Sequence, residues 1–504
     1  MRLIHMLNKL FTRSLALSVT ALSLVGCQLI AKDETVTANN TKPDKPLNVL
    51  MIAIDDLNNW GGAWGGPAIT PNLDQLAAQS SFFRNAYSAV PACNPSRVAV
   101  MTGQRSETTG AYLNETNFRT LPGGQDKVTM PQYFRKLGYE ATAAGKIFHH
   151  PRGQKAKPAV MSDDISWDYQ EAGPTGTGGY QDYVNEQGWA KWHGGIAEYE
   201  GLPIIPYIRK HGIWGPIQQT DEQTGDYHTA KYCADYLEKT HDKPFFLACG
   251  IFRPHSPQLA PQKYFDMYPL EDIKLPDVPA DDMQDIPNIA QHNWSSGFAK
   301  LVMSRPEEWK RAVQGYLAST TFADAMIGHI LEAFNNSQYA DNTVLVLWSD
   351  HGFQLGHKNR WEKFTFWKQG AGAPFIIKAP GVKPAIIDNP VSLIDIYPTL
   401  IELMQTPSKD DLDGVSLAPL MQQPKQAWPH PAIITYQQGN NAILLDKWNY
   451  IQYRDGSQEL YNQHQDPEEY HNLAADPQYK SVIDKLKTFI PEVVIPQKEY
   501  RPGG

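Results

Sequence analysis

Three apolar segments, far apart in the chain, restrict the possible folds more than any other feature of the sequence. Residues 47–54, 245–251 and 343–349 are nearly continuous apolar runs of strand length. Runs of this kind suit strands that are covered on both faces, as in a parallel sheet. A further short strand is expected at residues 139–144. We therefore expect these four segments to form the core of one sheet.

Helical patterns lie between the apolar runs. Residues 71–80 begin with a proline and space their apolar side chains to face inward, and residues 309–334 have the pattern of a long amphipathic helix. Alternating strands and helices predict an α/β fold, with a large, mixed but mostly parallel, doubly wound sheet flanked by helices. Ligands of such sheets bind at the carboxyl ends of the strands.

The pattern changes after Pro419. Several short strand candidates are separated by turn residues, and a helix is expected at about residues 479–489; the strand candidates are residues 432–436, 441–445 and 448–454. This pattern predicts a small antiparallel α+β subdomain. We expect a main domain at residues 47–425 and this C-terminal subdomain at residues 426–504.

The N-terminus has the features of a bacterial export signal. A basic start is followed by an apolar run at residues 15–25 and then by Gly26 and Cys27. Residues 24–27 resemble a lipobox, in which residues 1–26 are removed and Cys27 becomes the lipidated N-terminus; the alternative is a plain signal peptide cut near Gly26. Residues 27–46 are mostly polar, which predicts a flexible tether. We expect an exported protein that is lipid-anchored to the outer membrane, on its periplasmic or cell-surface side, and otherwise periplasmic.

The composition excludes some partners. The formal net charge of −9 gives no basic excess for a nucleic-acid partner. No later stretch is apolar and long enough to span a bilayer, so Cys27 is the expected membrane contact. Two further cysteines, Cys233 and Cys249, can form a disulfide in an oxidising periplasm or remain two small buried thiols.

The segment from Cys93 to Arg97 is the most informative short motif. It reads Cys-Asn-Pro-Ser-Arg and is followed by Thr102 and Gly103. A cysteine in this setting can be a nucleophile, a metal ligand or a core residue. We expect Cys93 at the N-terminus of a helix, where backbone N–H groups favour anions, and Arg97 on the same helical face.

Carboxylates follow two of the apolar runs. Asp55 and Asp56 come after the first run, and Asp350 with His351 after the run at residues 343–349. Clustered carboxylates repel one another unless a cation compensates them, and oxygen ligands suit Ca²⁺ or Mg²⁺. The alternative for an Asp-Asp pair is a helix cap or a turn.

Cationic and imidazole groups are expected beside these carboxylates. Lys146 and His149 are spaced to share a face if their segment turns as a helix, although the His149-His150 pair is also compatible with a simple loop. Arg253 and His255 follow the third strand and enter from its end. Lys358, Arg360 and Lys363 come shortly after Asp350 and His351, and this charge cluster forms either an anion clamp or a solvated face.

Taken together, these motifs resemble type I sulfatases of the alkaline-phosphatase superfamily, and more narrowly the branch that includes iduronate-2-sulfatases. The resemblance covers nearly all of the mature chain, in residues 50–57, 93–103, 145–149, 253–255, 316–331, 349–363 and 459–473. It implies that a maturation enzyme converts Cys93 to formylglycine. It also implies one calcium ion, held by Asp55, Asp56, Asp350, His351 and the modified Cys93.

The resemblance further assigns roles around the sulfate. It places Arg97, Lys146, His149, His255 and Lys363 there, with Arg253 and Arg360 as additional substrate-binding candidates. His351 stands where many sulfatases carry Asn, and an imidazole is an unusual calcium ligand. A calcium-bound hydroxyl of hydrated formylglycine is expected to attack sulfur, with His255 as the acid and His149 as the base that allows sulfate to leave.

The implied activity is the hydrolysis of sulfate esters in a sulfated polysaccharide or its oligosaccharides. Algal polymers such as ulvan or carrageenan and animal glycosaminoglycans are both compatible with the motifs. One alternative is a phosphonate or phosphate ester hydrolase of the same superfamily. Another is an inactive, lipid-anchored glycan-binding protein, which predicts the loss of site residues, whereas all of them are present.

Overall fold

The computed structural model describes residues 46–149, 162–171, 214–291 and 296–498. The described residues all belong to one compact unit. The predicted signal peptide, Cys27 and nearly all of the predicted tether lie outside the described residues, as does His150. Within the described ranges, no helix has both the length and the apolar character that crossing a membrane requires.

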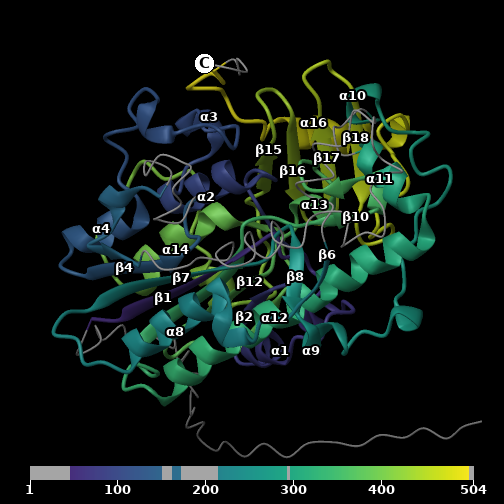
Figure 1. The fold of residues 1–504 in the computed structure, drawn as a ribbon. Helices are drawn as coiled ribbons and strands as arrows, with labels where there is room; N and C mark the ends of the chain where they lie inside the picture. The colour runs from purple at the N-terminus through teal and green to yellow at the C-terminus, as the bar shows by residue number, and fades with distance from the viewer. Residues whose placement is uncertain (1–45, 150–161, 172–213, 292–295, 499–504) are drawn as a thin grey trace, which may run out of the picture. The chain divides into compact units, whose positions relative to one another are not determined.

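The apolar runs form the centre of an eight-stranded sheet (Figure 1). Strand β1 (Asn48–Asp55) lies between β7 (Phe245–Pro254) and β9 (Thr343–Ser349) and is parallel to both. Strand β4 (Glu140–Gly145) extends the sheet beyond β7, again parallel. The four strands predicted from the sequence are therefore all present and adjacent.

The remaining strands make the sheet mixed. The full order is β13-β2-β12-β9-β1-β7-β4-β5, with β2 at Ser81–Phe83, β5 at Tyr169–Gln170, β12 at Phe375–Lys378 and β13 at Ala385–Ile387. Strand β12 runs antiparallel to both of its neighbours, β9 and β2. The predicted mixed, mostly parallel α/β sheet is thus confirmed.

Helices cover both faces of the sheet. Successive side chains of β1 point to opposite faces, so each face contributes apolar side chains to a different group of helices. Leu50, Ile52 and Ile54 pack with one group of helices, which consists of α1 (Pro71–Ala78), α8 (Gly225–Leu237) and α12 (Pro306–Asn336). Val49 and Met51 pack with the other group, which consists of α2 (Cys93–Thr102), α4 (Met130–Lys136) and α14 (Ile396–Leu403). Figure 1 shows the two layers on opposite sides of the central strands.

A second, four-stranded antiparallel sheet forms near the C-terminus (Figure 1). Its order is β15-β16-β17-β18, with strands Ala432–Thr435, Asn441–Leu445, Trp448–Gln452 and Gln458–Asn462. One face packs on α16 (Lys480–Lys487), and the other packs on Phe366 and Trp367. The predicted antiparallel subdomain is confirmed, and α16 is shorter than the predicted helix at residues 479–489.

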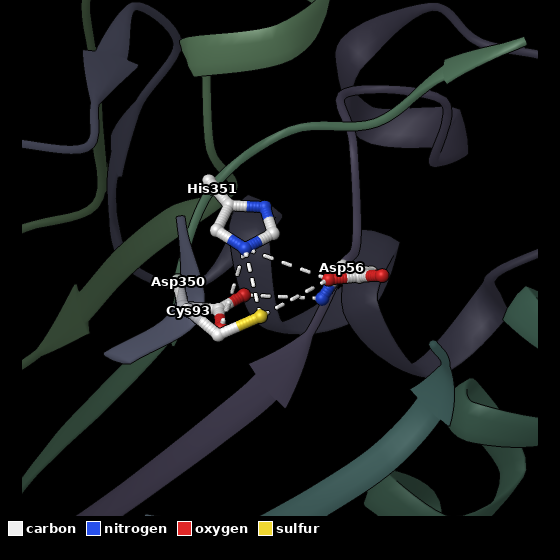
Figure 2. Close-up of side chains that lie close together, drawn as sticks. All are labelled: Asp56, Cys93, Asp350 and His351. Carbon is white, nitrogen blue, oxygen red and sulfur yellow. Dashed lines mark hydrogen bonds and ion pairs between the residues drawn. The ribbon is translucent and has the colours of Figure 1, made fainter. Parts of the chain in front are cut away.

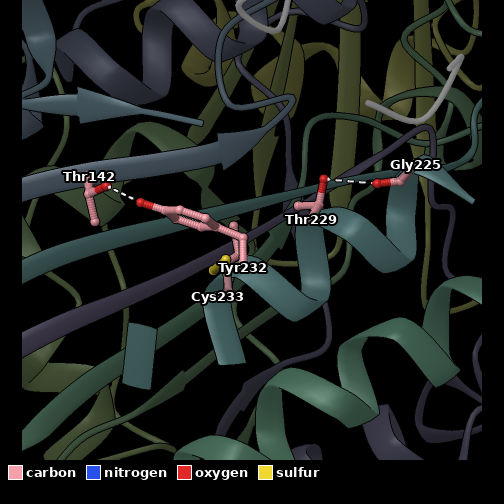
Figure 3. The surroundings of a disulfide bond; sticks show 6 residues. Thr142, Gly225, Thr229, Tyr232 and Cys233 are labelled. Carbon is pink, nitrogen blue, oxygen red and sulfur yellow. Dashed lines mark hydrogen bonds between the residues drawn. A yellow bond between two sulfur atoms is a disulfide. The ribbon is translucent and has the colours of Figure 1, made fainter. Parts of the chain in front are cut away.

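A disulfide joins Cys233 in α8 to Cys249 in β7. Figure 3 shows its surroundings, where Tyr232 of α8 also shares a hydrogen bond of 3.0 Å with Thr142 of β4. Of the two states that the sequence left open for these cysteines, the structure therefore has the bonded one. The bridge ties α8 to the strand that leads to Arg253 and His255.

Candidate active site

The candidate site lies where the carboxyl ends of neighbouring parallel strands meet. Asp55 is the last residue of β1, Asp56 follows it, and Asp350 and His351 follow β9. Cys93 is the first residue of α2, as expected from the sequence. The strand ends therefore bring together residues that are almost 300 positions apart, as in the contact from Asp56 to Asp350.

Four of these residues form a compact buried group (Figure 2). Each of Asp56, Cys93, Asp350 and His351 offers one atom that can bind a metal ion, and these four atoms all lie within 4.8 Å of one another. His351 Nε2 is 3.3 Å from Cys93 Sγ and 3.5 Å from Asp56 Oδ1. It is also 3.6 Å from Asp350 Oδ2. Among the residues that the structure describes, these four form the one group of side chains close enough together to hold a metal ion.

The donor set of this group suits a hard divalent cation. Carboxylate oxygens are the preferred ligands of Ca²⁺, and Asp56 Oδ2 is a buried oxygen that accepts no hydrogen bond within the described residues. Burial, which Lys363 only partly offsets, raises the pKa of Asp56 to about 8. Asp56 thus has both a vacant lone pair and an electrostatic reason to bind a cation. His351 Nδ1 is 2.9 Å from the Gly352 carbonyl oxygen, so Nε2 is the ring nitrogen that faces the group.

Asp55, also predicted as a metal ligand, makes different contacts from these four residues. One carboxylate oxygen accepts a hydrogen bond of 3.1 Å from Arg97 Nη2, and the other forms an ion pair with Lys146. Burial alone would raise the pKa of Asp55, but Lys146, together with His255 and Arg97, holds it well below the usual range. Asp55 is therefore a permanent anion beside the four-residue group.

Arg97 is fully buried, and its guanidinium makes hydrogen bonds to several segments around the site. Its Nε donates to Asp350 Oδ2 at 2.9 Å, and its Nη1 donates to the carbonyl oxygens of Lys146 and Ile147 at 2.5 and 3.0 Å. With the bond to Asp55, the guanidinium connects β1, β9 and the segment after β4. The predicted contact of Arg97 with sulfate stays a prediction.

Lys363 is the cation that lies closest to the thiol. Its Nζ is 3.2 Å from Cys93 Sγ and 2.6 Å from Asp56 Oδ1. Burial raises the pKa of Cys93, but Lys363 and Lys146 more than offset this, and the net direction is downward. The two lysines therefore favour the ionised form of the residue 93 side chain, against the effect of Asp55 and Asp350.

The segment Lys146–His149 does not form the expected helical turn. It follows β4 as a series of bends, with Gly145 at a φ of +72°. The carbonyl oxygens that a helix would use are bonded to Arg97 instead. Lys146 and His149 therefore share no helical face: Lys146 reaches Asp55, and His149 is half-buried at the end of the segment.

His255 and Arg253 approach from β7. His255 Nε2 is 3.9 Å from Asp56 Oδ2, and its Nδ1 is 2.6 Å from the carbonyl oxygen of Ser256. Burial holds the pKa of His255 well below its usual value. Arg253 is fully buried, and its Nη1 donates to the carbonyl oxygen of His255 at 2.8 Å, so it supports the backbone of His255.

The predicted cationic cluster after β9 is divided between two places. Lys363 joins Cys93, whereas Lys358 forms an ion pair with Asp282 at 2.7 Å. Arg360 is buried, donates to the carbonyl oxygen of Ala290 and lies over the Trp367 ring. Its role as a substrate-binding residue stays a prediction.

Sequence reasoning assigned no role to two hydroxyl groups that contact the turn after β1. Tyr316 in α12 and Ser349 at the end of β9 both bond to the backbone of residues 56–58. Tyr316 belongs to one of the stretches that carried the family resemblance, but a hydroxyl contact of this kind depends on the packing of α12 against β1.

Comparisons with known proteins identify the family. The family model described as Sulfatase matches residues 47–406, and the one described as N-sulphoglucosamine sulphohydrolase, C-terminal, matches residues 356–494. A sulfatase of Formosa agariphila is 35% identical, covering 92% of this chain and 90% of that protein. Human iduronate 2-sulfatase is 30% identical over 78% of this chain and 70% of its own length. An ulvan-active sulfatase of Formosa agariphila is 27% identical over 93% of this chain and 84% of that protein.

Solved structures agree on the fold. One is a protein in complex with its substrate D-glucosamine-2-N,6-O-disulfate, with a TM-score of 0.67, 18% identity and coverage of 88% of this chain and 96% of that one. The phosphonate monoester hydrolase of Agrobacterium radiobacter has a TM-score of 0.67 and 19% identity, covering 88% and 94% of the two chains. The extent of the family match and the 35% identical relative decide the assignment: the chain belongs to the sulfatase family of sulfuric ester hydrolases, as a type I sulfatase that resembles iduronate 2-sulfatase.

Proposed function

We propose that this protein hydrolyses sulfate esters of a sulfated polysaccharide or of its oligosaccharides, with a formylglycine made from Cys93 and one bound Ca²⁺. The observation that carries the proposal is the position of Cys93. Cys93 is the first residue of helix α2, and its Sγ lies within 3.3 Å of both His351 Nε2 and Lys363 Nζ. The sulfur here stands for an oxygen atom on Cβ of the formylglycine that the maturation enzyme, a necessary partner, would produce at the same backbone position.

Asp56, Asp350, His351 and the modified residue 93 would hold the ion, with Asp55 as a further ligand predicted by the resemblance. Calcium and hydrated formylglycine together supply an oxygen nucleophile at neutral pH. The chain itself fixes the ligands: Asp56 N–H donates to Asp350 Oδ1 at 3.1 Å, which links the two strand ends (Figure 2).

The cations would neutralise the charge of the sulfate group. Lys363 is in contact with residue 93, and Lys146 is the next cation beyond Asp55. Ammonium groups held in a buried site stabilise developing negative charge without reorganisation, which is how they would lower the barrier. Arg97, with donors bonded to Asp55 and Asp350, would contribute chiefly by its fixed charge.

Two histidines would move protons. His255 would donate a proton to the leaving sugar oxygen from Nε2, since Nδ1 donates to the carbonyl oxygen of Ser256. This role requires the doubly protonated imidazolium, so the negative charge of a bound sulfate ester would have to raise the pKa of His255, which burial lowers. His149 would accept the proton whose removal lets sulfate depart and regenerates the aldehyde. Both side chains are more exposed than the carboxylates, so they can meet a substrate that enters from solvent.

The proposed substrate class rests on the relatives. The name of one relative states activity on ulvan, and one similar structure is described as a complex with its own substrate, D-glucosamine-2-N,6-O-disulfate. We infer a sulfated carbohydrate for this chain as well, algal or glycosaminoglycan.

Export through residues 1–26 and a lipid anchor on Cys27 at the outer membrane would place the enzyme where such polymers are available. Replacement of Cys27 by Ser should release the protein from membranes; equal solubility of both forms would refute the anchor.

A mass measurement and a substrate panel test the proposal. Protein from a host with a maturation enzyme should yield a Cys93 peptide about 18 Da lighter than the thiol form. Fully active protein with an unmodified thiol would refute formylglycine. The panel compares sulfated oligosaccharides, aryl sulfates and aryl phosphonates, and faster turnover of phosphonates would refute a sulfate ester as the natural substrate. Cys93→Ser should abolish turnover while the fold persists.

A further inference from the structure

The residue after β1 has a backbone conformation that side chains rarely adopt. Asp56 has a φ of +63°, in the left-handed region. Aspartate tolerates this region better than most residues, but the conformation persists only where neighbouring groups fix it. Because Asp56 carries one of the four clustered donor groups, the contacts that fix its backbone also fix the direction of its carboxylate.

The hydroxyl of Tyr316 makes two hydrogen bonds to this turn. It donates to the carbonyl oxygen of Asp56 at 2.7 Å and accepts from the backbone N–H of Asn58 at 2.9 Å. One side chain on α12 thus closes the turn that begins at Asp56. Tyr316 is fully buried, so water cannot replace either bond.

The ring of Tyr316 is itself held in place. Its centroid lies 5.1 Å from that of Phe353 in a stacked arrangement and 5.8 Å from that of Trp60, edge to face. Phe353 follows His351 closely in sequence, so the ring packs against the other half of the site. Ring packing therefore helps to hold the hydroxyl in position.

Ser349 holds the same turn from β9. Its hydroxyl accepts from the backbone N–H of Leu57 at 3.0 Å and is 3.0 Å from the carbonyl oxygen of His351, to which it donates. The turn at residues 56–58 and the turn at residues 350–351 thus share one hydroxyl. Ser349 and Tyr316 together bond the backbone on both sides of the turn that orients Asp56 toward Asp350 and His351.

We propose that Tyr316 is a positioning residue of the metal site, which with Ser349 holds Asp56 in its left-handed conformation so that its carboxylate faces Cys93, Asp350 and His351. The hydroxyl of Tyr316 bonds to backbone atoms of Asp56 and Asn58, and Tyr316 is not one of the four clustered residues. The inference rests on the proposed calcium site and extends it to a residue on α12. Groups that orient metal ligands typically change metal affinity about 10–100-fold when they are removed.

The test is a calorimetric titration of chelator-treated protein with calcium alone, for wild type, Tyr316→Phe and Tyr268→Phe. Tyr268 is a matched control, because its hydroxyl accepts from the backbone N–H of Ile69 at 2.7 Å and bonds Thr321 on the same helix α12, without contacting the turn at residues 56–58. Each phenylalanine keeps the ring and removes one buried hydroxyl. We expect Tyr316→Phe to weaken calcium binding about 10–100-fold and Tyr268→Phe to leave it unchanged.

Activity provides a second readout. Tyr316→Phe should recover turnover as calcium is raised, with its midpoint shifted by the same factor as the affinity, which a general loss of structure would not produce. Calcium binding by Tyr316→Phe equal to wild type, or an equal loss in both variants, overturns the inference while leaving the metal site intact. Wild type that binds no calcium overturns the metal site itself, and the inference with it. If Tyr316→Phe does not fold, Ser349→Ala is judged by the same criteria.

Discussion

The ammonium group of Lys358 lies 2.7 Å from Asp282 Oδ1, and both side chains are almost completely buried. The same ammonium lies over the rings of Trp367 and Tyr461, 5.4 Å from each centroid. Lys358 belongs to the connection between β10 (Gln354–Leu355) and β11 (Trp361–Glu362), and Lys363 directly follows β11. The contact with Tyr461 of β18 therefore joins the segment before Lys363 to the C-terminal sheet, and Asp282 neutralises the buried ammonium group.

Removal of this buried charge should destabilise the protein strongly. In Lys358→Gln, the Asp282 carboxyl loses the ammonium group that pairs with it. Burial already raises the pKa of this carboxyl, which shows that its charge is costly at this position. Breaking one side of a buried ion pair costs about 3–5 kcal/mol, because the remaining charge is uncompensated. We expect a reduction of this size in the free energy of unfolding, measured by denaturant titration.

The control is an exposed ion pair of similar length. Lys231 and Asp235 on α8 are 2.7 Å apart, with side-chain exposures of 56% and 46%. Lys231→Gln should leave the free energy of unfolding nearly unchanged, because exposed ion pairs contribute little to stability. If both variants lost the same stability, the buried position of Lys358 would not be what matters.

The sequence was sufficient for the centre of the main sheet because the signal of its central strands is local, whereas the short strands β2, β5, β12 and β13 were not predicted. Strands β1, β7 and β9 are continuous apolar runs, and burial on both faces leaves no other pattern for them. The carboxylates after β1 and β9 could be placed together from topology alone, since parallel neighbours end at the same edge.

The remaining features depend on packing between distant elements. Nothing in the local sequence of Tyr316 shows that its hydroxyl reaches the backbone of Asp56. The spacing of Lys146 and His149 suggested a helical turn, but Arg97 binds the carbonyl groups that such a turn needs. Tertiary hydrogen bonds thus overrode a local pattern at the point where the site is assembled.

The disulfide between Cys233 and Cys249 should contribute measurably to stability. It closes a loop with a sequence separation of 16, for which the loss of chain entropy in the unfolded state corresponds to about 3 kcal/mol. Unfolding in the presence of dithiothreitol should therefore occur at lower denaturant concentration than without it. The measurement compares the two titrations on wild-type protein.

A variant without the bridge controls for other effects of the reductant. Cys233→Ala combined with Cys249→Ala should be less stable than oxidised wild type and should not respond to dithiothreitol. A response of the same size in the double variant would assign the effect to another group and would contradict the prediction.

The stability should also depend on pH through Asp395. Burial raises the pKa of this carboxyl to about 7, although backbone N–H groups of Val415 and Ser392 donate to it. An unfolded aspartate has a pKa of about 3.9, so the folded state binds an extra proton between about pH 4 and 7. The free energy of unfolding should therefore fall as the pH rises through this window, by up to about 1.4 kcal/mol per unit, and level off above it.

Denaturant titrations of wild type and Asp395→Asn between pH 4.5 and 8 isolate this contribution. The asparagine cannot titrate, so the stability of the variant should decline less steeply from pH 4.5 to 7, and the two curves should run parallel above pH 7. Asp235→Asn, on the exposed face of α8, should keep the wild-type slope. Curves of wild type and Asp395→Asn that are parallel over the whole range would show that Asp395 is ionised throughout.

The two histidines of the proposed mechanism should differ in which step they affect. If His255 protonates the leaving oxygen, His255→Ala should reduce kcat/KM on alkyl sugar sulfates by about 10²–10⁴-fold. Aryl sulfates with an acidic phenol need little protonation and should be affected much less. The position of His255 Nε2, 3.9 Å from Asp56 Oδ2, is compatible with this role. The measurement is kcat/KM on matched alkyl and aryl sulfates.

His149→Ala should instead stall the release of sulfate. Attack on the substrate would still occur, so enzyme sulfated at residue 93 should accumulate and show a mass increment on the Cys93 peptide after mixing with substrate. His255→Ala serves as the control, because slow attack leaves residue 93 unsulfated. If the histidines only maintain the shape of the pocket, both variants should lose the same factor on alkyl and aryl sulfates. Equal losses without trapped sulfated enzyme would contradict the division of roles, while the sulfatase assignment would stand because it rests on the family match.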